Sequence, residues 1–236
     1  MSYRLAAYCI TRNRYRLTRE SLKMLKNWSG VELDLYVADN GSTDETVQFL
    51  HRLVKEKRIK HLIDYEENMG QNIAANDLLD SMGGGGYDLI MRWDNDALPR
   101  TRNFLRKLLR YYAVFEKHGV RPVVSPYITK LKNPPPPMAF GDDAGFPYEL
   151  VAILGGICRI HPAEILRDWR FNRFGPMGFG EAGEMANFCD QIGVPLVRIT
   201  NVKVEHAYGE DGQMKKYPEH FEWEERAPGR YMSYGL

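Results

Sequence analysis

A regular alternation of apolar runs and amphipathic segments constrains the fold of this 236-residue chain more than any other feature. Apolar runs of strand length occur at residues 4–10, 33–38, 60–65 and 87–93. Segments with the period of a helix lie between them, near residues 17–27, 43–56 and 71–82. Because strands that alternate with helices are joined by crossover connections, the pattern predicts an α/β fold with a parallel sheet.

Composition limits the classes of protein that remain. With 44% apolar residues the chain can bury a sizeable core, and its net charge of +1 gives no overall field for nucleic acid or membranes. Cys9, Cys158 and Cys189 are odd in number and lie far apart, which argues against a disulfide framework and a zinc site. No stretch of about 18 consecutive apolar residues occurs. We therefore expect a soluble, cytoplasmic protein without an integral membrane segment.

The residues that follow each predicted strand are the first candidates for a site, because ligands of parallel sheets bind beyond the carboxyl ends of the strands. The stretch TRNR (11–14) follows the first strand. Asp39 ends the second strand, where its carboxylate can accept hydrogen bonds from a nucleoside. After it, Ser42 and Glu45 have the spacing of a capping box and predict the start of a helix. Gly70, after the third strand, permits close approach of the backbone.

Asp94 and Asp96 follow the fourth strand, and two unpaired carboxylates at the end of a buried strand would repel each other. A divalent cation resolves this conflict, since Mg²⁺ and Mn²⁺ prefer carboxylate oxygens and leave positions for water and phosphate. The alternative is that Asp94, Asn95 and Asp96 only cap the following helix, which is the more common explanation for an isolated pair.

The segment 133–150 contains four consecutive prolines and predicts a long loop. Loops of this length in a compact domain often act as lids or binding loops. Surface disorder is the alternative reading of the same residues.

Seven short motifs occur in an order that resembles the family 2 glycosyltransferases of the GT-A fold. They are CITRNR (9–14), VADNGSTDET (37–46), NMGQNIAAN (68–76), MRWDNDA (91–97), LGGICRIHPAEI (154–165), GFGEAGEMANFCDQIG (178–193) and VEHAYG (204–209). The resemblance implies a Rossmann-like, three-layer α/β/α domain with a mostly parallel central sheet over residues 1–209, followed by a tail at 210–236. Within the domain it implies a nucleotide-sugar-binding half, 1–98, and an acceptor-binding half, 99–209.

The resemblance also implies an activity, the metal-dependent transfer of a sugar from a nucleoside diphosphate sugar, usually a uridine diphosphate (UDP) sugar, to an acceptor hydroxyl. We expect a glycan, a protein or a small molecule as acceptor. A modified nucleic acid base is an alternative, because residues 100–112 and 167–174 interleave cations with aromatic side chains. A sugar-nucleotide nucleotidylyltransferase would need a glycine-rich loop where TRNR stands, and a non-catalytic nucleotide-sugar or carbohydrate-binding relative is a further alternative.

Carried onto this sequence, the resemblance assigns a role to each matching residue. The residues implied to bind the nucleotide sugar are Thr11, Arg12, Asp39, Asn68, Gly70, Asp94, Asn95, Gly155 and Gly156. The residues implied to hold Mn²⁺ or Mg²⁺ on the diphosphate are Asp94, Asp96 and His206. For His206 and for the glycine pair, a purely structural role is the alternative explanation.

One position departs from the family pattern. Family members carry an aspartate at the start of a helix, where it takes the proton of the acceptor hydroxyl during an inverting transfer, and this chain has Ala182 there. Glu181 and Glu184 flank that position and either can act as the base, and the sequence favours Glu181, which is the nearer of the two. Alternatively, both only stabilise the first turn of the helix, and the enzyme uses a retaining mechanism without a base at this position.

Overall fold

The computed structural model describes residues 3–83, 86–143, 145–167, 169–173 and 181–217. Its strands are β1 (Leu5–Thr11), β2 (Asp34–Asn40), β3 (His61–Tyr65), β4 (Leu89–Trp93), β5 (Ala97–Pro99), β6 (Val123–Thr129), β7 (Pro137–Asp142), β8 (Pro147–Val151), β9 (Cys158–Pro162) and β10 (Leu196–His206). Its helices are α1 (Tyr15–Trp28), α2 (Thr46–Lys55), α3 (Gln71–Met82), α4 (Phe104–Lys117), α5 (Ala163–Arg167), α6 (Glu181–Gln191) and α7 (Gly209–Lys216).

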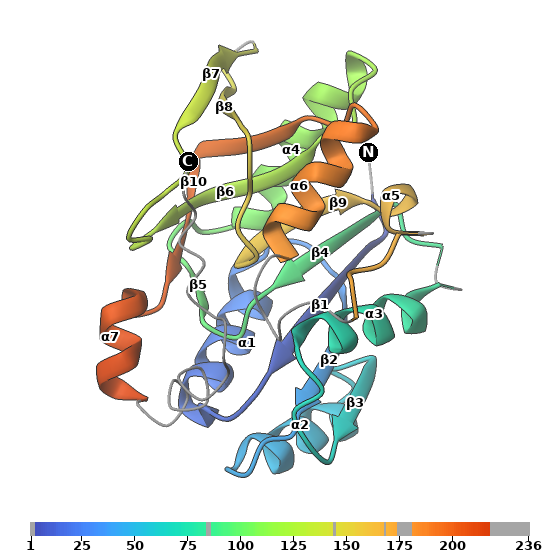
Figure 1. Ribbon diagram of the computed structural model, residues 1–236, viewed down its shortest axis with the longest axis vertical. Coiled ribbons are helices and arrows are strands. Elements are labelled where there is room, and N and C mark those ends of the chain that lie inside the picture. The colour runs from blue at the N-terminus through green and yellow to red at the C-terminus, as the bar shows by residue number, and fades with distance from the viewer. Residues whose placement is uncertain (1–2, 84–85, 144, 168, 174–180, 218–236) are drawn as a thin grey trace.

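The strands of the described residues form one mixed sheet (Figure 1). Nine of them follow the order β3-β2-β1-β4-β9-β6-β10-β8-β7, and β5 pairs with β10. The neighbours β3, β2, β1 and β4 are all parallel, as are β6 and β10. Between these two parallel groups, β9 runs antiparallel to both β4 and β6. The parallel core confirms the predicted α/β class, and the antiparallel strands come from the second half of the chain.

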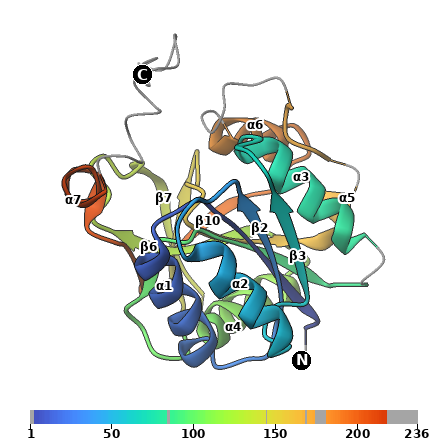
Figure 2. The ribbon, with the colours of Figure 1, turned by 90° about the horizontal axis from the view of Figure 1, so that it is seen from below.

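Helices cover both faces of the sheet and produce the expected three layers (Figure 2). Helices α1, α2 and α4 pack on one face, where they contribute to one hydrophobic core, and α3, α5 and α6 contribute to a second core on the other face. Successive residues of β1 alternate between the cores, since Ala7 and Cys9 join the first and Ala6 and Tyr8 join the second. A strand buried on both faces reads as a continuous apolar run, which is why the sequence pattern was visible.

The predicted strands and helices of the first half are confirmed, with ends that differ by no more than three residues. The predicted capping box is wrong. Helix α2 begins at Thr46 after Glu45, whose side chain accepts no capping hydrogen bond, and Ser42 lies outside the helix. The hydroxyl of Ser42 donates instead to Asp39, and Asp44 accepts a hydrogen bond from the Thr46 amide at 3.0 Å.

The predicted loop at 133–150 is also wrong, because most of this segment forms the antiparallel hairpin β7–β8. Strand β8 pairs with β10 and so joins the hairpin to the central sheet. Arg198 of β10 fixes it further, donating to Glu149 at 2.5 Å and to the Pro135 carbonyl at 2.9 Å. The proline run occupies only the start of the segment, and the pairing partner is distant in sequence, so the local pattern did not reveal the strands.

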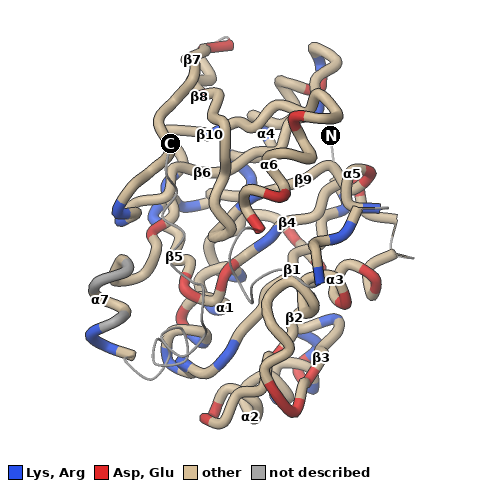
Figure 3. The backbone as a smooth tube through the Cα atoms, viewed as in Figure 1, with Lys and Arg blue, Asp and Glu red and all other residues tan. Residues whose placement is uncertain are grey.

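Two global features complete the description. Basic and acidic positions are interspersed along the backbone in the view of Figure 3, which agrees with the balanced net charge. Within the described residues, every helix is too short or too polar to cross a bilayer. The tail predicted from residue 210 begins inside helix α7, and its remainder from 218 lies outside the described residues.

Candidate active site

The candidate site lies at the carboxyl ends of β1, β2 and β4. In the parallel pairing of β1 with β2, Thr11 lies opposite Asp39, so the carboxyl ends of the two strands are neighbours. Asp94 follows directly after β4, which flanks β1 on its other side. The topology therefore brings the residues that follow the first, second and fourth strands to one edge of the sheet.

Asp39 is held by the turn that follows it. It is buried and accepts hydrogen bonds from the Ser42 amide at 2.9 Å and the Ser42 hydroxyl at 2.6 Å. Burial raises the pKa of Asp39, and the hydrogen bonds from Ser42 oppose this rise. Burial lowers the pKa of Arg12, while the charge of Asp39 acts in the opposite direction. The structure thus brings together Arg12 and Asp39, the two charged side chains predicted to bind the nucleoside.

The loop after β3 is fastened to the loop after β2. Asn68 accepts hydrogen bonds from the Asn40 side chain at 2.7 Å and from the Gly70 amide at 3.1 Å. Gly41 has a φ of +72°, and a Cβ at this position would come within 2.6 Å of the Glu67 backbone. Because of this close approach, the two loops form one continuous edge beside Asp39. Asn68 and Gly70 lie on that edge, and their role in nucleotide binding stays a prediction.

Asn95 anchors the loop after β4 to the start of α1. Its buried side chain donates to Thr11 at 3.0 Å and to Thr18 at 2.9 Å, and it accepts from Arg14 at 2.8 Å. These three hydrogen bonds occupy both the nitrogen and the oxygen of the Asn95 side-chain amide. Thr11 is likewise buried, with its hydroxyl 2.9 Å from that of Thr18. In this structure the side chains of Asn95 and Thr11 bind other residues of the protein and so fix the loop after β4 against the start of α1.

Asp94 is paired with a buried arginine of the preceding strand. Arg92 donates to Asp94 at 3.0 Å, and the Asp94 amide donates to the Ile157 carbonyl at 2.9 Å. Burial raises the pKa of Asp94, while the charge of Arg92 lowers it. A Cβ at Gly156 would lie 2.7 Å from the Arg92 guanidinium, so packing accounts for this glycine. At Gly155 a Cβ would meet nothing within 4 Å, which leaves open space beside Asp94's loop.

Asp96 has one oxygen in contact with polar groups and the other without a hydrogen-bond partner. Its Oδ2 accepts from Gln213 at 3.0 Å and from Arg14 at 3.3 Å, and lies 3.4 Å from His206 Nε2. Its Oδ1 is buried and has no hydrogen-bond partner. Burial raises the pKa of Asp96, but the contacts with His206 and Arg14 outweigh burial and hold this pKa below its ordinary value. Asp96 is therefore an ionised carboxylate with an unused oxygen.

This oxygen and the adjacent imidazole fit a divalent cation. Carboxylate oxygen and histidine nitrogen are both suitable ligands for Mn²⁺, and an unpartnered buried carboxylate oxygen is stabilised by a cation. Asp94, in contrast, is turned toward Arg92. Among the residues that the structure describes, no group of three or more His, Cys, Asp or Glu side chains is arranged to enclose a metal. Asp96 and His206 therefore offer a partial site, in which a bound phosphate and water would complete the coordination.

Glu181, the first residue of α6, is a buried carboxylate in an ion-pair network. It pairs with Arg92 of β4 and Arg159 of β9. Arg159 also donates to the Leu154 carbonyl at 3.1 Å and to His161 at 3.1 Å. Two guanidinium groups stabilise the ionised form of Glu181, which makes it a poor proton acceptor. Through Arg92, Glu181 is linked to Asp94.

Glu184 lies one turn further along α6 and has a different environment. It is partly exposed, and it accepts a hydrogen bond from the Asn172 amide at 2.9 Å. No arginine pairs with it among the described residues. Of the two predicted bases, Glu184 is the one whose carboxylate remains accessible.

Four residues of the site were not predicted, namely Arg14, Arg92, Arg159 and Gln213. Arg92 and Arg159 each interrupt an apolar strand, and a cation within such a run is a signal that could have found them. Arg14 belongs to the TRNR stretch, where it has a φ of +60° at the start of α1. Gln213 comes from α7, and nothing in the local sequence indicates its contact with Asp96.

The comparisons with known proteins agree with this geometry. A family model described as "Glycosyl transferase family 2" matches residues 8–162. That range includes β1 to β4 and the loop carrying Asp94 and Asp96. No curated protein matches the chain.

Several solved structures share the fold. A mannosyltransferase from Pyrobaculum calidifontis, in complex with GDP-Man and Mn²⁺, superimposes with a TM-score of 0.68 at 17% identity over 92% of this chain and 60% of its own. TarS from S. aureus, in complex with UDP-GlcNAc, gives 0.61 at 15% identity, over 88% and 60%. GalNAc-T7 with UDP, GalNAc and Mn²⁺ gives 0.69 at 11% identity, over 93% and 48%. The chain thus spans three fifths or less of these proteins, and at such identities the likeness shows the fold.

Proposed function

We propose, from the premise that this chain belongs to glycosyl transferase family 2, that it moves a sugar from a nucleoside diphosphate sugar to an acceptor hydroxyl. The observation that carries the proposal is the ionised Asp96, with one unused oxygen, next to His206 at the carboxyl edge of the sheet. The loops after β1, β2 and β3 form an edge beside it, where Arg12 and Asp39 would bind the nucleoside. The donor is proposed to be a UDP-sugar, as in two of the three neighbours described above, which are bound to uridine nucleotides.

A divalent cation, Mn²⁺ or Mg²⁺, would be held by Asp96 and His206, with Asp94 close by. Mn²⁺ is present in two of the neighbouring structures. When bound, such a cation supplies positive charge that stabilises the diphosphate as it leaves. Arg14 and His206 keep Asp96 ionised, so this carboxylate can bind a cation without first losing a proton.

The acceptor hydroxyl must lose a proton during an inverting transfer. Glu181 and Glu184 remain the candidates for the base, and the contacts favour Glu184, because both oxygens of Glu181 face guanidinium groups. We propose that Glu184 takes the proton and that Glu181 positions Arg92, which in turn holds Asp94. The sugar would then be transferred with inversion.

The acceptor is proposed to be a glycan, a protein or a small molecule. For a nucleic acid base, the aromatic side chains of 100–112 would have to stack on bases, but Phe104, Tyr111 and Tyr112 are buried in the core. The three cysteines are free and buried, which fits a reducing compartment such as the cytoplasm.

Release of nucleoside diphosphate tests the proposal directly. The protein is incubated with Mn²⁺ or Mg²⁺ and a panel of UDP- and GDP-sugars, with and without candidate hydroxyl acceptors, and free UDP or GDP is measured. We expect release from a UDP-sugar in wild-type protein and a loss of at least about 100-fold in Asp96→Asn, since a group that stabilises the leaving charge contributes on this scale. If no donor is turned over although nucleotide binds, the chain is the non-catalytic nucleotide-sugar-binding relative instead.

A further inference from the structure

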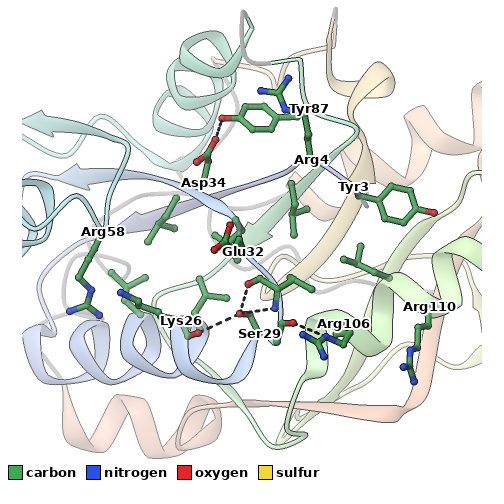
Figure 4. Close-up of a pocket in the computed structure, with 18 of the residues that line it drawn as sticks. Tyr3, Arg4, Lys26, Ser29, Glu32, Asp34, Arg58, Tyr87, Arg106 and Arg110 are labelled. Atoms are coloured by element: carbon green, nitrogen blue, oxygen red, sulfur yellow. Dashed lines mark hydrogen bonds between the residues drawn. The ribbon is translucent and has the colours of Figure 1, made fainter. Parts of the chain in front are cut away.

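A cavity lies at the opposite end of the sheet from the candidate active site. It has a volume of about 1370 Å³ and is bounded by the starts of β1 and β2 and by helices α1 and α4 (Figure 4). The seven residues of β1 separate it from the active-site edge, a distance of roughly 20 Å at about 3.3 Å per residue. This cavity is therefore distinct from the site that would hold the nucleotide sugar.

The floor of the cavity is apolar. Its lining includes the partly buried Val31, Leu33 and Leu109, backed by Leu5, Leu22, Leu25 and Leu35, which are buried in the hydrophobic core. These apolar side chains come from both helices, from both strands and from the segment between α1 and β2. A hydrocarbon chain placed on this floor would be partly removed from water, which favours its binding.

The rim of the cavity is basic. Seven lining residues are Lys or Arg and two are Asp or Glu, in a protein whose overall charge is +1. Figure 4 shows Lys26 of α1 and Arg106 and Arg110 of α4 at this rim. Of the two acids, Asp34 is already neutralised, because it accepts from Lys60 at 2.5 Å and from Tyr87 at 2.6 Å.

Four of the rim cations are unpaired within the part of the chain that the structure describes. There, the side chains of Lys26, Lys57, Arg110 and Lys117 make no hydrogen bond or ion pair, although each lines the cavity. Arg106 donates through Nε to the Gly30 carbonyl at 2.7 Å, which fixes its guanidinium at the rim. Unpaired cations around an apolar floor are complementary to a ligand that is anionic at one end and apolar at the other.

We propose that this cavity binds an anionic amphiphile, a phosphate group carried on a hydrocarbon chain. The chain would lie on the leucine floor, and the phosphate would be bound by cations of the basic rim, such as Arg106 and Arg110 of α4. The proposal does not depend on the transfer reaction, because none of these residues belongs to the candidate active site. Such a ligand has two sources, a soluble alkyl phosphate ester or an anionic lipid of a membrane, and both have the chemistry that the cavity requires.

Calorimetric titration with decyl phosphate below its micelle concentration tests the proposal. The test variant is Lys26→Gln/Arg110→Gln, and the matched control is Lys23→Gln/Lys107→Gln, which removes two exposed cations from the same helices but outside the cavity. We expect about fivefold weaker binding for each rim cation removed, and affinity of the control within twofold of wild type. All four positions are exposed, so unchanged melting temperatures should show that both variants fold.

Two further ligands test the floor. Shortening the chain from decyl to octyl phosphate should weaken binding by up to about fourfold for each CH₂ removed, whereas inorganic phosphate and uncharged decyl maltoside should bind far more weakly. Equal weakening in the control variant, or binding of inorganic phosphate as tight as that of decyl phosphate, would overturn the proposal. Co-sedimentation with phosphatidic acid vesicles but not with phosphatidylcholine vesicles, lost in the test variant, would support a membrane lipid as the source. Decyl phosphate binding without co-sedimentation would support a soluble ligand.

Discussion

At the scale of single residues, buried arginines determine how each carboxylate of the candidate site behaves. Arg14 contacts Asp96, whereas Arg92 lies between Asp94 and Glu181. Removing one partner of a buried ion pair leaves an uncompensated charge and costs about 3–5 kcal/mol. Glu184, in contrast, has no arginine partner among the described residues, and its carboxylate accepts only the Asn172 amide there. We therefore expect Glu181 to matter mainly for stability and Glu184 to matter mainly for catalysis.

The first prediction uses this separation. Glu184→Gln should lower kcat by about 100-fold or more, because a carboxylate base contributes 10²–10⁴ in rate, while nucleotide affinity and melting temperature stay close to wild type. Glu181→Gln should instead lower the free energy of unfolding by about 3–5 kcal/mol, since Arg92 and Arg159 lose their shared counter-charge. Denaturant unfolding and steady-state kinetics on both variants check this. A fully stable Glu181→Gln protein with lost turnover, beside an active Glu184→Gln, would return the base to Glu181.

The second prediction concerns His161 of β9, a buried residue whose Nε2 accepts a hydrogen bond from Arg159. Burial first, and then the charges of Arg159 and Arg92, hold the pKa of His161 well below its ordinary value near 6.5. The unfolded chain therefore binds a proton that the folded protein does not, and stability is lost as the pH falls below about 6.5. The loss reaches about 1.4 kcal/mol per pH unit for this one group.

Denaturant titrations of wild type and His161→Gln between pH 7.5 and 5 measure this effect. The glutamine carbonyl can still accept from Arg159 but does not titrate, so the variant should lose less stability than wild type as the pH falls. Parallel curves for the two proteins over this range would show that His161 is not held neutral.

At the scale of elements, the site depends on loops that are fastened to one another. The loop after β1 is joined to the loop after β2 by the hydrogen bond from the Asn13 amide to Ser42 at 2.7 Å. The loops after β2 and β3 meet at Gly41, whose missing side chain leaves room for the Glu67 backbone. Helix α7 contributes Gln213, which contacts Asp96 at 3.0 Å and the Ala207 carbonyl at 3.0 Å.

The third prediction separates close approach from backbone conformation at Gly41. Gly41→Ala should cost more stability than Gly119→Ala, because both glycines have φ near +70° but only a Cβ at Gly41 would meet neighbouring backbone, at 2.6 Å. Gly119→Ala should cost about 1–2 kcal/mol for its left-handed conformation alone. Gly41→Ala should also weaken nucleotide binding, since displacement of Glu67 moves the edge beside Asp39. Equal losses of stability in the two variants, measured by denaturant unfolding, would mean that the two loops can separate without cost.

Local patterns predicted some elements and missed others for identifiable reasons. The strands and helices up to Trp93 were predicted because their apolar periodicity is local and each strand is buried on both faces. Hairpin β7–β8 was missed because it pairs with β10, which is distant in sequence, and because a run of four prolines leads into β7. The role of Ser42 was mispredicted because its hydroxyl donates to Asp39 and accepts from the Asn13 amide, and the second of these contacts comes from a distant part of the sequence.

At the scale of the whole molecule, the parallel core places a candidate ligand site at each end of the sheet. The predicted site residues at the ends of β1, β2 and β4 came together because topology alone requires it. The contact of Arg14 with Gln213 joins residues 199 positions apart, and the sequence gives no sign of such a pairing. Long-range contacts of this kind determine which carboxylate has an oxygen without a hydrogen-bond partner. The different environments of Asp94, Asp96 and Glu181 could therefore be seen only in the folded structure.

The central claim is that the ionised Asp96, with its unused oxygen, makes nucleotide binding dependent on a divalent cation. Calorimetric titration of UDP into the protein, with Mn²⁺ and then with EDTA, measures this most directly. The same titrations on Asp96→Asn, with Asp190→Asn as an exposed control on α6, assign the effect to the site. We predict that Mn²⁺ strengthens UDP binding at least about tenfold, a gain of about 1.4 kcal/mol, in wild type and in the control, and that Asp96→Asn abolishes the gain while remaining folded. Equal UDP affinity with Mn²⁺ and with EDTA in wild type, or an undiminished gain in Asp96→Asn, would contradict the account.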